Sequence, residues 1–135
     1  MNPQSLTPAA LMAKADTACA SAQMLLDAGD VDGATNRAYY AMFDAARAAL
    51  MASGAPLEPE SGRTHSGLIG AFGLHLVKNG PVARELGRQL NRAHEIRLVA
   101  DYRGESVSLA DAAEIVAQAA AFVAALRAQF MAGAG

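Results

Sequence analysis

The chain has no tryptophan, a single cysteine and few aromatic residues, and each scarcity narrows the classes of protein it can belong to. One thiol cannot form an intrachain disulfide, which excludes a disulfide framework. Cys19 stands between alanines in a helical stretch, and this favours a small buried hydrophobe over a nucleophile or ligand. Because β-branched residues never gather into an alternating run, the sequence also argues against a sheet.

Two further absences concern membranes and bound cofactors. The N-terminus lacks a basic segment followed by an apolar one, and no continuous apolar run reaches the roughly 18 residues of a spanning helix. The sequence therefore predicts a soluble, cytoplasmic protein with no membrane association. No grouping of His, Cys, Asp and Glu has metal-ligand spacing, and no glycine-rich phosphate loop occurs, so we expect no metal and no cofactor.

The residues that are present predict an all-α protein. The chain has 135 residues, 53% of them hydrophobic, which suits one domain over residues 1–135 with a single core. Helix-forming residues, above all alanine, dominate the sequence. Capping and helix-breaking residues separate five segments in which apolar residues recur at helical spacing. We expect these over residues 8–29, 31–54, 64–79, 81–104 and 108–130, with a loop at 54–63. They should form an antiparallel bundle of four long helices and a shorter one.

The fourth predicted helix carries two charged residues in its apolar stripe. At about 100° per residue, Arg97 and Asp101 fall on the same face as Leu90 and Ala93. Two interpretations are open. Arg97 and Asp101 could form a structural ion pair one turn apart, or Arg97 could face a groove that binds a phosphate or a partner carboxylate.

The second predicted helix has a polar stripe of its own. Arg37, Tyr40, Asp44 and Arg47 follow one another at spacings of three, four and three, with Tyr39 on the other side. Such a stripe is ordinarily a solvated face in which the aspartate bridges the arginines. Polar groups inside apolar helices are costly unless they are used, however, and the second and fourth helices are therefore predicted to meet around a site.

Charge and histidines add to this prediction. Residues 63–103 carry a net charge of +4, whereas the whole chain carries −2, and a local basic surface favours an anionic ligand. His65, at the start of the third helix, suits capping or a bond to a neighbouring helix better than catalysis. His94 lies at the edge of the apolar stripe of the fourth helix.

Four segments together resemble the HEPN domain proteins, particularly the small stand-alone branch of bacteria and archaea. They are residues 32–50 with their Arg-Ala-Tyr-Tyr-Ala-Met-Phe motif, 64–67, 86–91, and the Arg-Leu-Val-Ala-Asp-Tyr segment at 97–102. The resemblance implies a helical bundle, a two-fold homodimer, and a minimal nucleotidyltransferase partner in a toxin–antitoxin pair. Many HEPN proteins are metal-independent ribonucleases with an arginine followed four to six residues later by a histidine.

This chain departs from that motif, because Asp101 and Tyr102 stand where the histidine is expected after Arg97. A literal match runs from Arg88 to His94, but six residues place the two side chains about 120° apart on a straight helix. We therefore interpret that match as coincidental. By the resemblance, the catalytic residues are Arg97, Asp101 and Tyr102, and the substrate-binding residues are Arg37, Tyr40, Arg47 and His65.

Two functions follow from the sequence. The first is a toxin-like HEPN protein that cleaves RNA without a metal. The second is a non-catalytic HEPN module that binds RNA, a nucleotide or a nucleotidyltransferase through the same groove.

Overall fold

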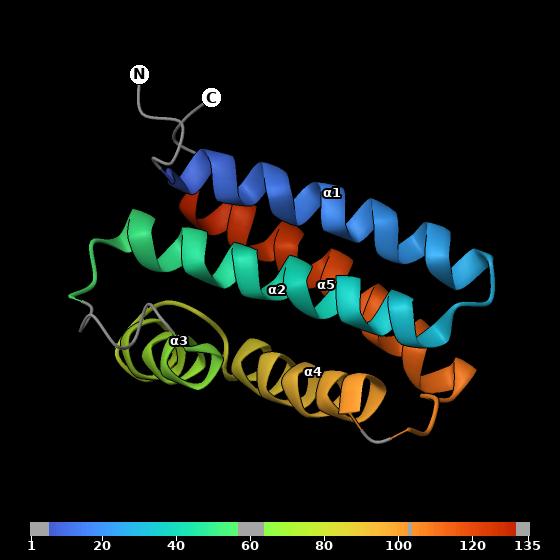
Figure 1. Ribbon diagram of the computed structural model, residues 1–135. Coiled ribbons are helices and arrows are strands. Elements are labelled where there is room, and N and C mark those ends of the chain that lie inside the picture. Colours follow the sequence, from blue (N-terminus) through green and yellow to red (C-terminus); the bar gives the residue numbers. More distant parts are fainter. Residues whose placement is uncertain (1–5, 57–63, 103, 132–135) are drawn as a thin grey trace.

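The fold is all-α, as the sequence predicts. The computed structural model describes residues 6–56, 64–102 and 104–131, and these form helices with no strand (Figure 1). The predicted helix over residues 64–79 is a short α-helix that continues into a π-helical segment, η2. The elements are α1 (Pro8–Asp27), α2 (Val31–Ser53), α3 (His65–Ala71), η2 (Phe72–Lys78), α4 (Arg84–Tyr102) and α5 (Leu109–Phe130). Most of the predicted loop, residues 57–63, lies outside the described residues.

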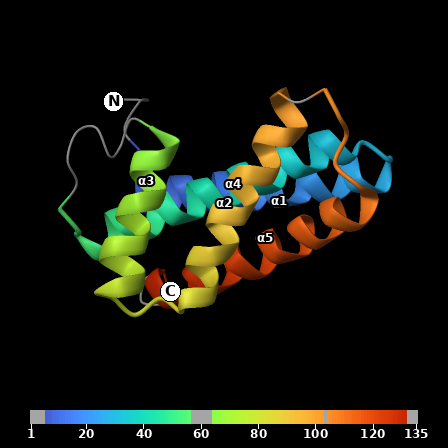
Figure 2. The same cartoon turned by 90° about the horizontal axis from the view of Figure 1, so that it is seen from below.

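The helices form two layers around α2. Helices α1 and α5 pack against α2 on one side, and α3 with η2 and α4 lies on the other side (Figures 1 and 2). Helix α1 runs antiparallel to α2, and α4 runs antiparallel to α5 (Figure 1). The predicted facing of the second and fourth helices is confirmed, since α2 and α4 are in direct contact.

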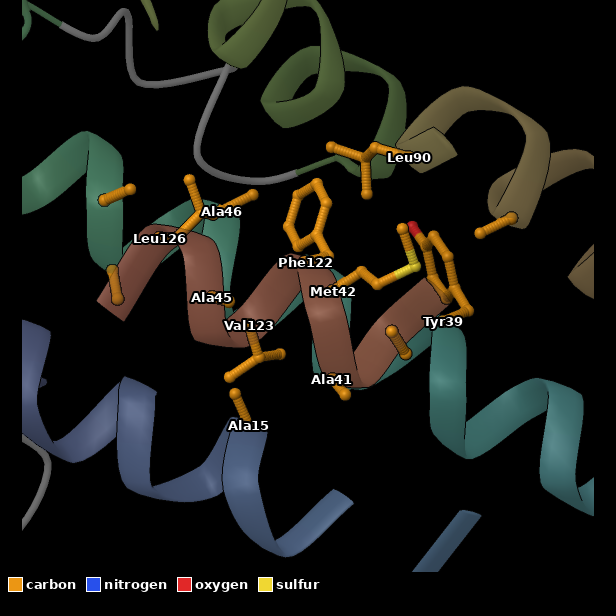
Figure 3. Packing of buried hydrophobic residues seen from close by; sticks show 14 of the residues in the cluster. Ala15, Tyr39, Ala41, Met42, Ala45, Ala46, Leu90, Phe122, Val123 and Leu126 are labelled. Atoms are coloured by element: carbon orange, nitrogen blue, oxygen red, sulfur yellow. The ribbon is translucent and has the colours of Figure 1, made fainter. Parts of the chain in front are cut away.

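Small side chains allow α2 to occupy the centre. The alanines that α2 turns toward its neighbours have no exposed surface, and their small side chains let the neighbouring helices approach closely. Larger residues then fill the space between the layers: Phe122 of α5 and Leu90 of α4 join the same buried cluster as Met42 of α2 (Figure 3). Phe72 of η2 packs on Phe122 with ring centres 5.7 Å apart, which ties the two layers together.

Most helix boundaries follow from local capping chemistry. The side chains of four N-cap residues accept hydrogen bonds from backbone N–H groups three residues later: Thr7, Asp30, Thr64 and Ser108. Gly54 ends α2 in the left-handed region, with a φ of 72°. One prediction was wrong: α4 begins at Arg84 rather than at Pro81. The N–H of Val82 donates to the carbonyl of Leu76 at 2.8 Å, so this stretch turns back onto η2 before the helix starts.

That turn depends on Gly80. A Cβ at this position would lie 2.6 Å from the carbonyl oxygen of His75 and 2.7 Å from that of Leu76, both of them backbone atoms. We expect Gly80→Ala to lower the free energy of unfolding by about 1–3 kcal/mol, measured by urea denaturation. Gly70→Ala is the matched control, because its Cβ meets nothing within 4 Å. Two equally stable variants would contradict the prediction.

Helix α5 meets a membrane-span criterion of length and composition, with a mean hydropathy of 1.6 over its best 18 residues. The expectation from the sequence was that no continuous apolar run reaches about 18 residues, and in α5 Asp111, Glu114 and Gln118 interrupt the apolar run. Its buried residues, including Ile115, Phe122 and Leu126, belong to the core cluster, and a buried core helix passes the same test. The cytoplasmic location stays a prediction.

Candidate functional site

Three elements bring aromatic rings around one buried arginine. Arg97 of α4 is only 6% exposed. Its guanidinium carbon lies 4.9 Å from the ring centre of Tyr39 and 5.8 Å from that of Tyr40, both on α2. His94 of α4 and His65 of α3 complete the group. We call these five residues the arginine cluster.

Arg97 is held by an ion pair with Asp101, one turn along α4. Its Nη1 donates to the carboxylate of Asp101 at 3.3 Å, and the side-chain amide of Asn36 on α2 donates to the same carboxylate at 3.2 and 3.4 Å. The Nε of Arg97 is buried and has no hydrogen-bond partner among the described residues. The predicted structural pair thus exists, and the Nε of Arg97 remains a buried donor without a partner in that part of the chain.

Arg97 keeps its positive charge in the folded protein. Burial by itself lowers the pKa of Arg97, but the bond to Asp101 and the facing rings of Tyr40 and Tyr39 raise it, and on balance the pKa is above its ordinary value. A guanidinium over two aromatic faces is also stabilised by cation–π attraction. The cluster therefore contains a permanent, oriented positive charge.

Two histidines lie beside this charge. Their rings are nearly parallel, with an interplanar angle of 6° and centres 6.0 Å apart. The hydroxyl of Tyr39 lies 2.5 Å from Nδ1 of His65. Burial raises the pKa of Tyr39 well above its ordinary value, so this hydroxyl keeps its proton and shares one hydrogen bond with the ring of His65, in which the tautomer of His65 decides the donor. Nδ1 of His94 is buried without a partner in the described part of the chain.

Both histidines favour the neutral form. Burial lowers the pKa of His65, with further lowering by Arg97 and His94. Burial and Arg97 likewise lower the pKa of His94, against a smaller raising effect of Glu95. Near neutral pH the cluster therefore combines one fixed cation with two neutral imidazoles, one of which can accept a proton.

These shifts predict a loss of stability in mild acid. A histidine whose pKa is lower in the folded state binds fewer protons there than in the unfolded chain, so stability is complete above about pH 6.5 and falls as the pH drops below it. We expect urea midpoints to decrease between about pH 7 and pH 5. The His94→Gln variant should show a shallower decrease. An unchanged slope in that variant would argue against a neutral buried His94.

The structure places the sequence-predicted site residues in three groups. Tyr40 and His65 belong to the arginine cluster, and Asp101 is bonded to it. Arg37 adjoins the cluster, with its guanidinium carbon 5.3 Å from the ring centre of Tyr40. The other two predicted residues, Arg47 and Tyr102, have no recorded contact with the cluster.

Arg47 and Tyr102 lie apart for different reasons. Burial raises the pKa of Asp44, while Lys14 of α1, Arg47 and Arg37 lower it, which places Arg47 in a charge group with Asp44 and α1. Tyr102, the last residue of α4, is 74% exposed. It is available to a ligand or partner but is not part of the buried site.

Two cluster residues, Tyr39 and His94, were not predicted from the sequence. Tyr39 was assigned to the side opposite Tyr40, yet both rings, together with Phe43, pack on His65. A buried tyrosine needs a hydrogen-bond partner for its hydroxyl, and this requirement was the feature of the sequence that could have indicated Tyr39 as part of the site. His94 was paired with Arg88 only by a motif, and the structure separates the two: Arg88 is exposed and pairs with Glu85 at 3.7 Å.

Among the described residues, no group of three or more His, Cys, Asp or Glu could hold a metal ion. The cluster is built instead from a cation, two imidazoles and phenol rings, all of which can contact a phosphate or a base. The expectation that the protein needs no metal or other cofactor stays a prediction.

The fold and this cluster define a helical-bundle protein with a polar site between α2, α3 and α4. Residues 9–129 match the family described as HEPN domain. The chain belongs to the HEPN family, so the resemblance seen in the sequence is confirmed.

Curated relatives come from both bacteria and archaea. A UPF0332 protein of Gloeobacter violaceus is 38% identical over 115 residues, which cover 84% of this chain and 87% of that protein. A UPF0332 protein of Thermotoga maritima is 41% identical over 86 residues, 64% of this chain and 61% of the relative. A protein of Methanocaldococcus jannaschii named "Putative toxin MJ0605" is 32% identical over 114 residues, 84% of this chain and 81% of the relative.

Proposed function

We propose that this chain is a toxin-like HEPN protein that cleaves RNA without a metal at the arginine cluster. The observation that carries the proposal is a buried, permanently charged Arg97 beside two neutral imidazoles. Membership of the HEPN family and the toxin named among its relatives support it. In this proposal a phosphate reaches Arg97 past the half-buried side chains of Tyr40, His65 and His94, which form the rim of the site.

The cluster has the groups that cleavage by a neighbouring ribose hydroxyl requires. His94 accepts the proton of the 2′-hydroxyl as that oxygen attacks the adjacent phosphorus. Arg97 stabilises the negative charge that develops on the phosphate oxygens, and His65 donates a hydrogen bond from Nε2 in the tautomer in which its Nδ1 accepts from Tyr39. The proton taken up by His94 returns to the departing 5′ oxygen. The products are a 2′,3′-cyclic phosphate and a 5′-hydroxyl.

Asp101 acts as a positioning residue in this scheme. The family resemblance implies that it is a catalytic residue, but its carboxylate accepts hydrogen bonds from both Arg97 and Asn36. These bonds commit the carboxylate to holding Arg97 and Asn36, so in this scheme it takes no proton from the substrate. It orients the guanidinium of Arg97 toward the rings. Arg37 and the exposed Tyr102 would contact the flanking RNA chain.

The test compares an RNA oligonucleotide with the same sequence carrying 2′-O-methyl groups, both with purified protein in EDTA. We expect cleavage of the unmodified RNA alone, with 2′,3′-cyclic phosphate ends detected by mass spectrometry. Cleavage of the methylated RNA, or a requirement for a divalent cation, would contradict the mechanism.

One observation favours a non-catalytic alternative. Arg97 is engaged by Asp101, and the histidine that usually follows the arginine in this family does not follow Arg97 in this chain. A module of this kind would bind RNA, a nucleotide or a nucleotidyltransferase at the same rim without cleaving RNA. Tight binding of the unmodified RNA with no product after prolonged incubation would favour it.

The pairing with a minimal nucleotidyltransferase as antitoxin is part of the same proposal and rests on the family resemblance. A neighbouring reading frame for such an enzyme, and co-purification of the two proteins, would support it. The exposed Tyr102 at the end of α4 is the residue we expect the partner to reach, so we place it outside the homodimer interface proposed below. Co-purification that survives Tyr102→Ala would argue against this contact.

We also expect a homodimer. Helix α4 exposes Leu98, a large apolar side chain that directly follows Arg97 in the chain. An isologous interface there would cover Leu98 and bring two clusters together across a two-fold axis. Light scattering at tens of micromolar should give the mass of a dimer, and a monomer at that concentration would contradict the prediction.

A further inference from the structure

A cavity adjoins the arginine cluster, and the two share the side chain of His94. This cavity of about 480 Å³ opens between α3 with η2 on one side and α4 on the other, and Figure 2 shows these elements side by side. Its lining includes Ser66, Gly70, Gly73, Lys78, Asn91 and His94. An adjoining cavity of about 420 Å³ shares Gly73 and Asn91 and continues between Val77 and Arg84.

We propose that the first cavity binds one unpaired RNA base, preferentially adenine, beside the phosphate that is cleaved. The inference rests on the proposed function, because it makes this cavity the specificity pocket of the same site. His94 provides the connection. Its ring is 5.4 Å from that of Tyr39 inside the cluster, and the same side chain lines the cavity.

The shape of the cavity suits a flat ring. Its lining includes the apolar side chains of Ile69 and Leu74, and Leu74 is 47% exposed although it is a leucine. Gly70 and Gly73 line the same side, and a Cβ at either position would meet nothing within 4 Å. The two glycines therefore leave a smooth surface of backbone with open space above it. Bases bind to such surfaces through stacking and apolar contact, and histidine rings are common stacking partners.

The polar groups of the cavity indicate which base fits. The amide nitrogen of Asn91 donates to the carbonyl of Gly87 at 3.0 Å, which fixes the orientation of that side chain. Its Oδ1 remains to accept a hydrogen bond from an exocyclic amino group, and its second N–H can donate to a ring nitrogen. That pair of bonds is the one asparagine makes with adenine. Uracil, which has no amino group, fits least well.

The charges around the two cavities complement a nucleic-acid strand. Lys78 lines the first cavity and Arg84 the second, and neither has an ion pair within the described residues. Arg88 and Arg92 also line the second cavity, though acidic neighbours partly neutralise them. Phosphates that follow the bound base would lie against this basic side, as in other proteins that bind single strands.

Gly73→Leu provides a sharp test, because the new side chain fills the cavity from a position with open space. Replacement of a helical glycine should not cost stability. Ala124→Leu is the matched control, since it fills a groove of about 330 Å³ between α1 and α5. The probes are fluorescent 2′-O-methyl hexamers of adenosine and of uridine, which cannot be cleaved. Binding is followed by anisotropy at one fixed salt concentration.

We expect the wild type and Ala124→Leu to bind the adenosine hexamer about tenfold more tightly than the uridine hexamer. Gly73→Leu should lose most of that preference, and Asn91→Ala should reduce it with little change in thermal stability. Equal affinity of the wild type for both hexamers, no binding of either, or a preference that survives in Gly73→Leu would overturn the proposal. A base preference in a protein that does not cleave unmodified RNA would leave the pocket standing and remove only the proposed catalysis.

Discussion

Replacing Arg97 with alanine is expected to lower the free energy of unfolding by about 2–4 kcal/mol and to abolish RNA cleavage. The loss of stability follows from the burial of the pair, since the side chain of Arg97 is 8% exposed and that of Asp101 is 26% exposed. The substitution leaves a carboxylate without its counter-charge and two tyrosine faces without their cation. Because Asn36 still donates to Asp101, we expect a cost below that of a fully buried orphan charge.

Urea denaturation measures this change, and Arg88→Ala is its control on the same helix. The side chain of Arg88 is 68% exposed and pairs only with Glu85, so its removal should cost less than about 0.5 kcal/mol. Equal stability of the two variants would contradict a structural role for Arg97. Arg97→Lys separates charge from shape: it keeps the charge but loses the planar fork, and should recover part of the stability with little of the cleavage.

The second large effect concerns Tyr39, which is fully buried and contacts four other rings. Tyr39→Ala should cost about 3–5 kcal/mol, because it removes a large aromatic side chain from the contact between α2, α3 and α4. Tyr39→Phe keeps the ring and removes only the hydroxyl that bonds His65, at a cost of about 1 kcal/mol. Similar costs for the two variants, compared by urea denaturation, would mean that packing of the ring does not hold the cluster together.

The helices could be predicted because their boundaries depend on local chemistry. The side chains of Thr7 and Ser108 cap α1 and α5 by accepting a hydrogen bond from the backbone N–H three residues later. Gly54 ends α2 with a left-handed backbone. The π-helical form of η2 and the late start of α4 could not be predicted in this way. The late start of α4 depends on the bond between the N–H of Val82 and the carbonyl of Leu76 and on the close approach at Gly80, both of which arise from the folded turn.

The site was only partly predictable for a related reason. The spacing of Arg97 and Asp101 on one helix is visible in the sequence, and their pair is present. The position of His94 is not, because helical periodicity shows which residues share a face but not which neighbouring helix that face meets. Once α3 places His65 opposite α4, His94 joins the cluster. The same limit explains Arg47, whose charge lies with Asp44 and α1 instead of with Arg97.

The decisive measurement is RNA cleavage in EDTA by the wild type and by Arg97→Ala, with each rate divided by the fraction of protein folded under the assay conditions. We predict metal-independent cleavage by the wild type and a loss of at least about a hundredfold per folded molecule in the variant. An equal rate per folded molecule would show that Arg97 only stabilises the fold, and it would contradict the assignment of the arginine cluster as the site of catalysis.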